Sequence, residues 1–357
     1  SGDDVDMQPT GPTDIVAFGT EPDVGLALLH IDIENNSVAS YNLLNDLNIG
    51  SVFTVQVLES SKQVEIMSFD NFGGVPEVKL TSFVPASQNF SSQALNVDLT
   101  DYLWSSGASS EKYIVVKGVS RTDPANAMFT LFARGSNNGE LFTACESCRF
   151  NRDIPPLIIG DILYDLYLSR EDNFWYIQAI NLEDQTVKFL SRLNDSPRVV
   201  IGEPNLFIDE INQELQIHNN MNFESMGFQN FSLLLGQGLR QAVDNKTLAF
   251  RVLPQPAPIA SEVNIYDLNT GNVIEDFTWN ELNANTSVFS EKVGFTLGFM
   301  PLLSYVDLKR DFALFDIFEV ANSGNPNRFA LVYSNYANQY NGHIETPFRA
   351  HSVVAVF

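Results

Sequence analysis

The sequence predicts an all-β protein made of three tandem β-sandwich domains, and three observations lead to that prediction. Short apolar segments bounded by turn residues occupy almost the whole chain, one hairpin pattern occurs three times, and a continuous apolar segment follows each copy. The 357 residues are 44% hydrophobic, which is enough to form several cores. No segment approaches the ~18 uninterrupted apolar residues of a membrane-spanning helix.

The predicted strands are runs of Val, Ile, Leu, Phe and Tyr that end at Asn, Asp, Gly, Ser or Pro. Helical spacing of apolar residues is almost absent, and we expect only short helical turns, around residues 43–48 and 279–283. The clearest predicted strands are 51–60, 63–69, 111–119, 127–134, 174–182 and 351–357.

A hairpin pattern is repeated along the chain. Residues 30–46 align without a gap with residues 179–195, and six of the seventeen positions are identical. A third copy, NIYDLNTGNVIEDF, begins at Asn264 and has one extra residue. Each copy has an apolar strand, a polar turn and a return strand, which is the pattern of a β-hairpin.

Continuous apolar segments follow the three copies. YIVVKGV, FSLLLGQG and HSVVAVF begin at Tyr113, Phe231 and His351, and these starts lie 118 and 120 residues apart. Continuous apolar segments are typical of strands that are buried on both faces. We therefore expect one such strand to close each domain. The predicted parts are a flexible tether at 1–13 and sandwich domains at 14–135, 136–244 and 245–357.

A seven-bladed β-propeller is the alternative architecture. Residues 14–357 divided by seven give about 49 residues each, which suits a propeller blade. We find no Gly or Trp-Asp motif in each blade, and the best matches occur three times rather than seven. The sequence therefore favours the sandwich array.

The segment 248–273 resembles the opening of a domain-of-unknown-function family, which forms repeated immunoglobulin-like sandwiches in bacterial lipoproteins and secreted proteins. The Pro-rich turn of that family is clear only in the third repeat here. The resemblance implies immunoglobulin-like domains and export, and it implies no catalytic residue. The matching residues are Arg251, Val252, Pro254 to Pro258, Val263 to Tyr266 and Gly271, with the closing segments from Tyr113, Phe231 and His351.

The first residues, SGDDVDMQPT, resemble the stretch that follows the acylated cysteine of Gram-negative lipoproteins. The resemblance implies a lipid anchor and a location at the outer membrane, on the cell surface or in the periplasm. The same composition also fits a plain solvated terminus.

Cys145 and Cys148 are the two cysteines of the chain and form a C-x-x-C pair. Such a pair serves as a redox dithiol, half of a zinc site or a small disulfide loop. A structural zinc site needs four ligands, and the sequence has no second C-x-x-C and no H-x-x-x-H spacing. The redox motif opens a helix in a βαβ unit, which this sequence lacks. We therefore expect a local disulfide and no metal.

The net charge excludes several partners. Lys and Arg number 20 and Asp and Glu number 44, which gives −24 at pH 7. This charge repels nucleic-acid phosphates and anionic lipid headgroups, so we expect no nucleic acid, and membrane contact only through the N-terminal lipid anchor.

Catalytic motifs are absent from the sequence. There is no G-x-S-x-G elbow, P-loop or G-x-G-x-x-G, and the carboxylate pairs are interpreted as surface charge. Asp-rich and Asn-rich turns suit calcium but do not match an EF-hand loop, so we expect no cofactor, with calcium as the open alternative. Tryptophans are expected in the core, and exposed ones would stack on sugars. The residues considered are Asp161 with Asp165, Glu171 with Asp172, Glu210 with Glu214, and Trp104, Trp175 and Trp279.

These features predict a non-enzymatic, exported protein that is a structural, adhesive or ligand-binding component of the cell envelope or of an extracellular assembly. Its expected partners are other envelope or extracellular proteins, or further copies of itself paired through edge strands. The alternative is a propeller-type glycan-binding or carbohydrate-active protein.

Overall fold

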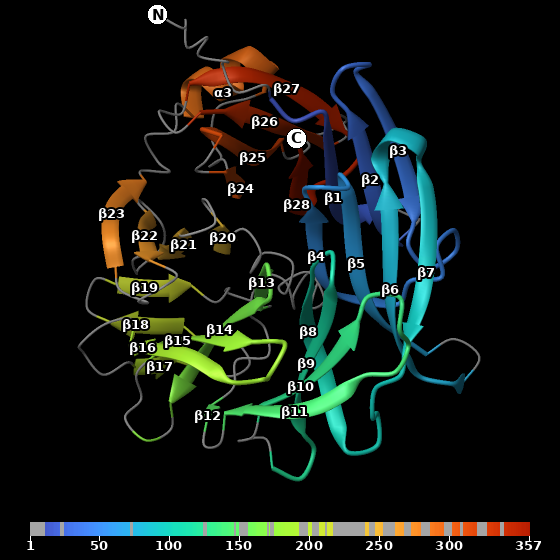
Figure 1. Cartoon of the computed structure of the whole chain (residues 1–357). Coiled ribbons are helices and arrows are strands. Elements are labelled where there is room, and N and C mark those ends of the chain that lie inside the picture. The colour runs from blue at the N-terminus through green and yellow to red at the C-terminus, as the bar shows by residue number, and fades with distance from the viewer. Residues whose placement is uncertain are drawn as a thin grey trace, which may run out of the picture.

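The structure is a computed structural model, and it describes most of the N-terminal half of the chain and separate segments of the C-terminal half. These residues form seven antiparallel sheets, which follow one another along the chain and stand in a ring (Figure 1). We call the sheets blades 1 to 7. The described residues are 11–21, 25–71, 74–123, 127–145, 148–149, 156–169, 171, 175–192, 199–201, 207–210, 213–216, 240–242, 247–252, 261–267, 273–279, 286–295, 302–307, 310–319, 327–335 and 339–357.

Blades 2, 3, 5, 6 and 7 are meanders in which consecutive strands pair, whereas blade 1 includes the distant strand β28 and blade 4 has two strands paired with β14. Blade 1 contains β28 (Ala350–Val356), β1 (Asp14–Glu21), β2 (Gly25–Asp32) and β3 (Ser37–Asn42). Blade 2 contains β4 (Ser51–Leu58), β5 (Gln63–Asp70), β6 (Glu77–Val84) and β7 (Asn89–Leu95). Blade 3 contains β8 (Tyr102–Ser109), β9 (Tyr113–Ser120), β10 (Ala127–Ala133) and β11 (Glu140–Cys145).

The remaining blades complete the ring. Blade 4 contains β12 (Cys148–Arg149) and β13 (Leu157–Ile159), which both pair with β14 (Ile162–Ser169), then β15 (Trp175–Asn181) and β16 (Val187–Arg192). Blade 5 contains β17 (Val199–Ile201), β18 (Phe207–Glu210) and β19 (Gln213–Gln216). Blade 6 contains β20 (Arg240–Ala242), β21 (Thr247–Val252), β22 (Ser261–Asp267) and β23 (Val273–Trp279). Blade 7 contains β24 (Leu302–Asp307), β25 (Phe312–Glu319), β26 (Arg328–Ser334) and β27 (Tyr340–Thr346), and the helix α3 (Thr286–Val293) precedes it.

The two ends of the described chain close the ring. β28 pairs antiparallel with β1, and Val16 lies opposite Val354. The red C-terminal strand therefore completes the blue first blade in Figure 1. The register shifts at Gly19, where an added Cβ would lie 2.2 Å from the Arg349 carbonyl oxygen and 2.4 Å from the Phe348 ring. Only glycine fits this close approach of the closing strand.

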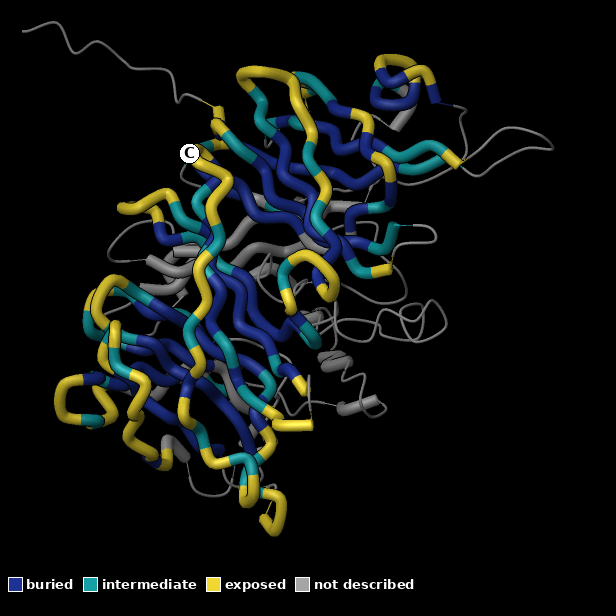
Figure 2. Tube along the Cα trace, turned by 90° about the vertical axis from the view of Figure 1, so that its right-hand side faces the viewer, coloured by how far each residue is buried: buried dark blue, intermediate teal, exposed yellow. Residues whose placement is uncertain are grey.

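Apolar cores lie between neighbouring blades. One cluster joins blades 1 and 2 through Phe18 and Phe83, and another joins blades 3 and 4 through Phe129 and Leu163. A further cluster, which includes Leu314, joins blade 7 to blade 1. Figure 2 shows buried residues along the middle of the strands and exposed residues at the turns. Central strands are buried on both faces, which is why their sequences are continuously apolar.

The predicted array of three immunoglobulin-like sandwiches is wrong, and the alternative, a seven-bladed β-propeller, describes the chain. A sandwich needs two sheets packed face to face within one domain, whereas here seven consecutive sheets of the described residues stand around one axis and β28 closes on β1. The repeated hairpin is the pair of outer strands of a blade, β2 and β3 in blade 1, β15 and β16 in blade 4, and β22 and β23 in blade 6.

The predicted closing strands have different places in their blades. The segment from Tyr113 is β9, the second strand of blade 3, while the segment from His351 belongs to β28, an innermost strand. The expected boundary after residue 135 falls between β10 and β11 of one sheet. The closing segment from Phe231, the boundary at 244 and most of the tether lie outside the described residues.

Two local expectations concern helices. Residues 43–47 form turns, as expected, and the Asp46 N–H donates to the Asn42 carbonyl oxygen at 3.0 Å, while 280–283 lie outside the described residues. The helix α3 was not expected; it packs Phe289 and Val293 against blade 7. Among the described residues, no helix is long and apolar enough to cross a membrane.

Candidate functional site

Four turns that follow innermost strands lie at the same end of the ring. They connect an inner strand of a blade to the strand that follows it, and their described residues are 59–62 in blade 2, 110–112 in blade 3, 160–161 in blade 4 and 310–311 in blade 7. The innermost strands of these blades and β28 neighbour one another in the order β24, β28, β4, β8 and β13. Side chains of the turns contact across the blades. We call this set the turn ring: Glu59, Ser60, Ser61, Glu111, Lys112, Asp161, Arg310 and Phe357.

Arg310 joins blade 7 to blade 2. Its Nη1 lies 3.1 Å from Glu59 Oε1 and 2.9 Å from Asp307 Oδ2. The guanidinium also lies over the Phe357 ring, 4.3 Å from the centroid, and Phe357 directly follows β28. Arg310 therefore spans the end of the closing strand.

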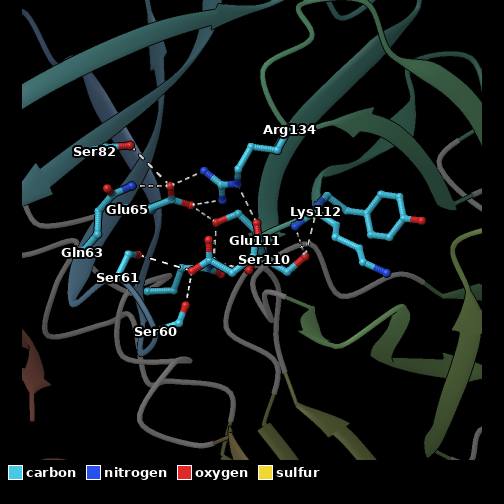
Figure 3. A network of polar contacts seen from close by, with 12 residues as sticks. Ser60, Ser61, Gln63, Glu65, Ser82, Ser110, Glu111, Lys112 and Arg134 are labelled. Carbon is cyan, nitrogen blue, oxygen red and sulfur yellow. Dashed lines mark hydrogen bonds and ion pairs between the residues drawn. The ribbon is translucent and has the colours of Figure 1, made fainter.

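Glu111 joins blade 3 to blade 2. Its Oε1 accepts hydrogen bonds from the hydroxyls of Ser60 and Ser61, the latter at 3.4 Å (Figure 3). Among the described side chains, every hydrogen bond to the Glu111 carboxylate is accepted by Oε1. The hydrogen bond from Arg310 to the Glu59 carboxylate is likewise accepted by Oε1 alone. Each of the two carboxylates thus keeps an oxygen for other donors.

Lys112 joins blade 3 to blade 4. Its Nζ donates to both oxygens of Asp161, at 2.8 and 3.1 Å. This hydrogen bond and the charge of Asp161 raise the pKa of Lys112 above its ordinary value, so the side chain is cationic at neutral pH. The side chains of Glu59 and Lys112 are each 62% exposed. Solvent screens such pairs, so the turn ring is a patterned surface rather than a main source of stability.

An ion pair beneath the turn ring joins the buried Glu65 to Arg134, whose side chain is 25% exposed. The guanidinium of Arg134 contacts both oxygens of the Glu65 carboxylate, at 2.7 and 2.9 Å, and Gln63 and Ser82 donate to Oε1 at 2.9 and 3.3 Å (Figure 3). Ser109 donates to Oε2. Five donors occupy the roughly four lone-pair sites of this carboxylate. Glu65 is therefore unsuited to act as a general base.

Arg134 connects that pair to the turn ring. Its Nε donates to the Ser110 carbonyl oxygen at 2.7 Å, and its backbone N–H donates to the Lys112 carbonyl oxygen at 2.8 Å. Gln56 of β4 donates to the Ser109 carbonyl oxygen at 2.6 Å. The turn that carries Glu111 and Lys112 is thus held from below by side chains of two blades.

Further buried charges join other blades. Lys117 of β9 lies 2.6 Å from Asp165 of β14, and neither side chain is exposed. Arg349, just before β28, lies 2.9 Å from Asp316 of β25. Burial raises the pKa of Asp316 from 3.8 to about 6, and Arg349 opposes that rise. These pairs lie between packed sheets and serve the joints between blades.

The sequence-predicted carboxylate pairs do not form one site. Asp161 belongs to the turn ring, whereas Asp165 is buried against Lys117. Glu171 is exposed. Asp172 and the side chains of Glu210 and Glu214 lie outside the described residues. The calcium alternative receives no support from the described residues, where no group of three His, Cys, Asp or Glu side chains could hold a metal ion.

The tryptophans and cysteines are placed only in part. Trp104 is buried, as predicted, and its Nε1 donates to the Asp98 carbonyl oxygen at 2.7 Å. The side chains of Trp175 and Trp279 lie outside the described residues. Cys145 ends β11 and Cys148 begins β12, but their side chains also lie outside that part, so the disulfide stays a prediction.

The turn ring and the pairs beneath it were not predicted from the sequence. One signal was present: Lys117 stands inside the apolar segment YIVVKGV, and a lysine in a buried strand needs a buried partner. Glu65 in QVEIMSF gives the same signal. Their partners, Asp165 and Arg134, depend on which blades are neighbours.

No protein-family model and no curated protein matches this chain. The β-propeller domain of the Trilobed protease from Pyrococcus furiosus has 11% identity and a TM-score of 0.40, over 93% of this chain and 94% of that one. A putative 6-phosphogluconolactonase from Bacteroides fragilis has 13% identity and a TM-score of 0.42, over 97% and 98%. A subtype N10 neuraminidase-like protein of A/little yellow-shouldered bat/Guatemala/060/2010 has 9% identity and a TM-score of 0.40, over 84% of each chain.

The resemblance to a family of tandem immunoglobulin-like repeats is therefore wrong. No family model matches, and the described sheets are blades of a ring rather than pairs of packed sheets. TM-scores near 0.4 are too low to support a fold assignment. The assignment of a propeller therefore rests on the order of the sheets and on the pairing of β28 with β1.

Proposed function

We propose that this propeller is a non-catalytic binding protein that holds a neutral, hydroxyl-rich ligand, a glycan, on its turn ring. The observation that carries the proposal is the pattern of the ring: carboxylates, hydroxyls and cations alternate across neighbouring turns, and Glu59 and Glu111 each use only one oxygen within it. Carboxylate oxygens accept strong hydrogen bonds from sugar hydroxyls.

Preorganisation supports this proposal. Each ring side chain is held by a partner on a neighbouring turn, so little side-chain freedom remains to be lost on binding. The charge of the chain, −24, disfavours acidic sugars and favours neutral ones.

The absence of catalysis is part of the proposal. Glycoside hydrolysis needs one carboxylic acid and one carboxylate across a sugar. Among the described residues, the buried carboxylates each pair with a cation, either within a blade or between two blades: Glu65, Asp70, Asp165, Asp307 and Asp316. We also propose that the protein acts in the cell envelope or outside the cell, because its first residues resemble those of exported lipoproteins.

The test is calorimetric titration of the full chain with neutral β-1,4-linked hexasaccharides of glucose, xylose and mannose, and with an anionic alginate hexamer. We expect at least one neutral sugar to bind and alginate not to bind. Glu111→Gln and Glu59→Gln should each weaken binding about tenfold or more, because a charged acceptor is lost. Glu34→Gln, which changes an exposed carboxylate in the β2–β3 turn, is the matched control and should bind normally.

Two results would overturn the proposed function. One is the absence of binding to every neutral hexasaccharide, and the other is equal affinity in the Glu111, Glu59 and Glu34 variants. Release of shorter sugars from a bound hexasaccharide during prolonged incubation would instead overturn the absence of catalysis.

A further inference from the structure

We infer that Arg134 is a positioning residue, which sets the orientation of the 110–112 turn and thereby the contacts that Glu111 and Lys112 make with the neighbouring turns. The part of this inference that concerns ligand affinity rests on the proposed function. The part that concerns the turn itself does not.

The 110–112 turn has a special place in the ring. Glu111 reaches back to Ser60 and Ser61 of blade 2, while the next residue, Lys112, reaches forward to Asp161 of blade 4. Two adjacent side chains therefore join three blades. A small rotation of this turn would change both links at once.

Arg134 fixes that turn at two carbonyl groups. The side-chain Nε donates to the Ser110 carbonyl oxygen at 2.7 Å, and the backbone N–H donates to the Lys112 carbonyl oxygen at 2.8 Å. Within the turn, the Ser110 N–H donates to the Tyr113 carbonyl oxygen at 2.8 Å. The guanidinium thus binds the turn at the residue before Glu111, and the backbone binds it at the residue after.

Glu65 determines where the guanidinium lies. Its fully buried carboxylate receives Nη1 and Nη2 of Arg134 in a two-bond fork, and Gln63 and Ser82 hold the carboxylate from β5 and β6. The order of contacts runs from blade 2 through Glu65 to Arg134, and from Arg134 to the turn of blade 3 (Figure 3). An ion pair with one buried and one partly exposed member is a weak source of stability, so its main contribution is the geometry that it imposes.

Lysine cannot replace Arg134 in this role. The planar guanidinium makes the fork to Glu65 and the separate bond to Ser110 at the same time, whereas an ammonium has one nitrogen. Arg134→Lys therefore keeps the charge beside Glu65 and removes the side-chain hold on the turn. Arg328→Lys is the matched control, because Arg328 also joins carboxylates, Glu345 and Glu319, to a backbone carbonyl, that of Gly294, but in blade 7.

The first experiment needs no ligand. Amide hydrogen exchange of the full-length chain is measured for wild type, Arg134→Lys and Arg328→Lys, with the Leu182 amide, which donates to the Asp161 carbonyl oxygen, as the reference. We expect exchange at Ser110 to rise about tenfold or more in Arg134→Lys, with Leu182 unchanged and with no such rise in Arg328→Lys. Unchanged exchange at Ser110 would overturn the inference, and so would an equal rise at Leu182.

The second experiment is a double-mutant cycle on affinity for the neutral hexasaccharide that binds wild type. If Arg134 acts by presenting Glu111, Arg134→Lys weakens binding about tenfold in the wild-type background and much less in the Glu111→Gln background. Additive effects would overturn this route. If no hexasaccharide binds wild type, the proposed function fails, while the exchange result still decides the positioning of the turn.

Discussion

The ammonium of Lys117 in blade 3 lies 2.6 Å from Oδ1 of Asp165 in blade 4, and both side chains are fully buried. Neighbouring blades are therefore joined by charge as well as by apolar packing. The same arrangement occurs between blades 7 and 1, where Arg349 meets Asp316.

Replacing Lys117 by Met should cost about 3–5 kcal/mol of unfolding free energy, because it leaves Asp165 charged and unpaired inside the protein. The double variant Lys117→Met, Asp165→Leu should recover most of that loss, since two apolar side chains replace two buried charges. Urea denaturation followed by fluorescence measures both. A single variant as stable as wild type would contradict the importance of the pair.

An exposed member of the turn ring should behave differently. Glu59→Gln removes a carboxylate that is 62% exposed, so the unfolding free energy should change by no more than about 0.5 kcal/mol. The same urea experiment tests this expectation. A loss as large as that of Lys117→Met would show that Arg310 and Glu59 hold the ring closed.

Gly19→Ala should destabilise the closing strand. The new methyl group would lie 2.2 Å from the Arg349 carbonyl oxygen and 2.4 Å from the Phe348 ring, so β1 and β28 must separate or shift. We expect a loss of about 1–3 kcal/mol, measured as a lower denaturation midpoint. Gly11→Ala is the control, because an added Cβ there meets nothing within 4 Å.

Asp316 should give stability an unusual pH dependence. Burial raises its pKa in the folded protein to about 6, above 3.8, so between these values the folded state holds a proton that the unfolded state has released. Its contribution is therefore fully present below about pH 4 and is lost as pH rises toward 6. Relative to wild type, Asp316→Asn should gain up to about 3 kcal/mol between pH 4 and 7. A constant difference across this range would contradict the raised pKa.

The sequence predicted the strands well and their assembly poorly. Segments such as 63–69 and 127–134 became β5 and β10 because short apolar runs between turn residues specify strands locally. Whether such strands form sandwiches or propeller blades depends on which sheets pack against each other in the folded chain. Hairpins alone do not encode that relationship, and copies of the hairpin in blades 1, 4 and 6 looked like three domains.

The candidate site was harder to predict for the same reason. Glu111 and Lys112 are unremarkable charges in the sequence, and they become a site only because blades 2 and 4 bring Ser60 and Asp161 beside them. Buried charges were the better signal. A lysine within YIVVKGV requires an acidic neighbour, although its position in the sequence gives no means to choose Asp165.

The pairing of β28 with β1 also sets the order in which the molecule can be completed. Thr13 and Val356, which are hydrogen-bonded, are 343 residues apart, so the strand that finishes the first blade is synthesised long after β1. Until then β1 presents an unpaired edge, which is open to association with other chains. Contacts of such long sequence separation also slow folding. We therefore expect the newly made protein to depend on chaperones until β28 has been made and pairs with β1.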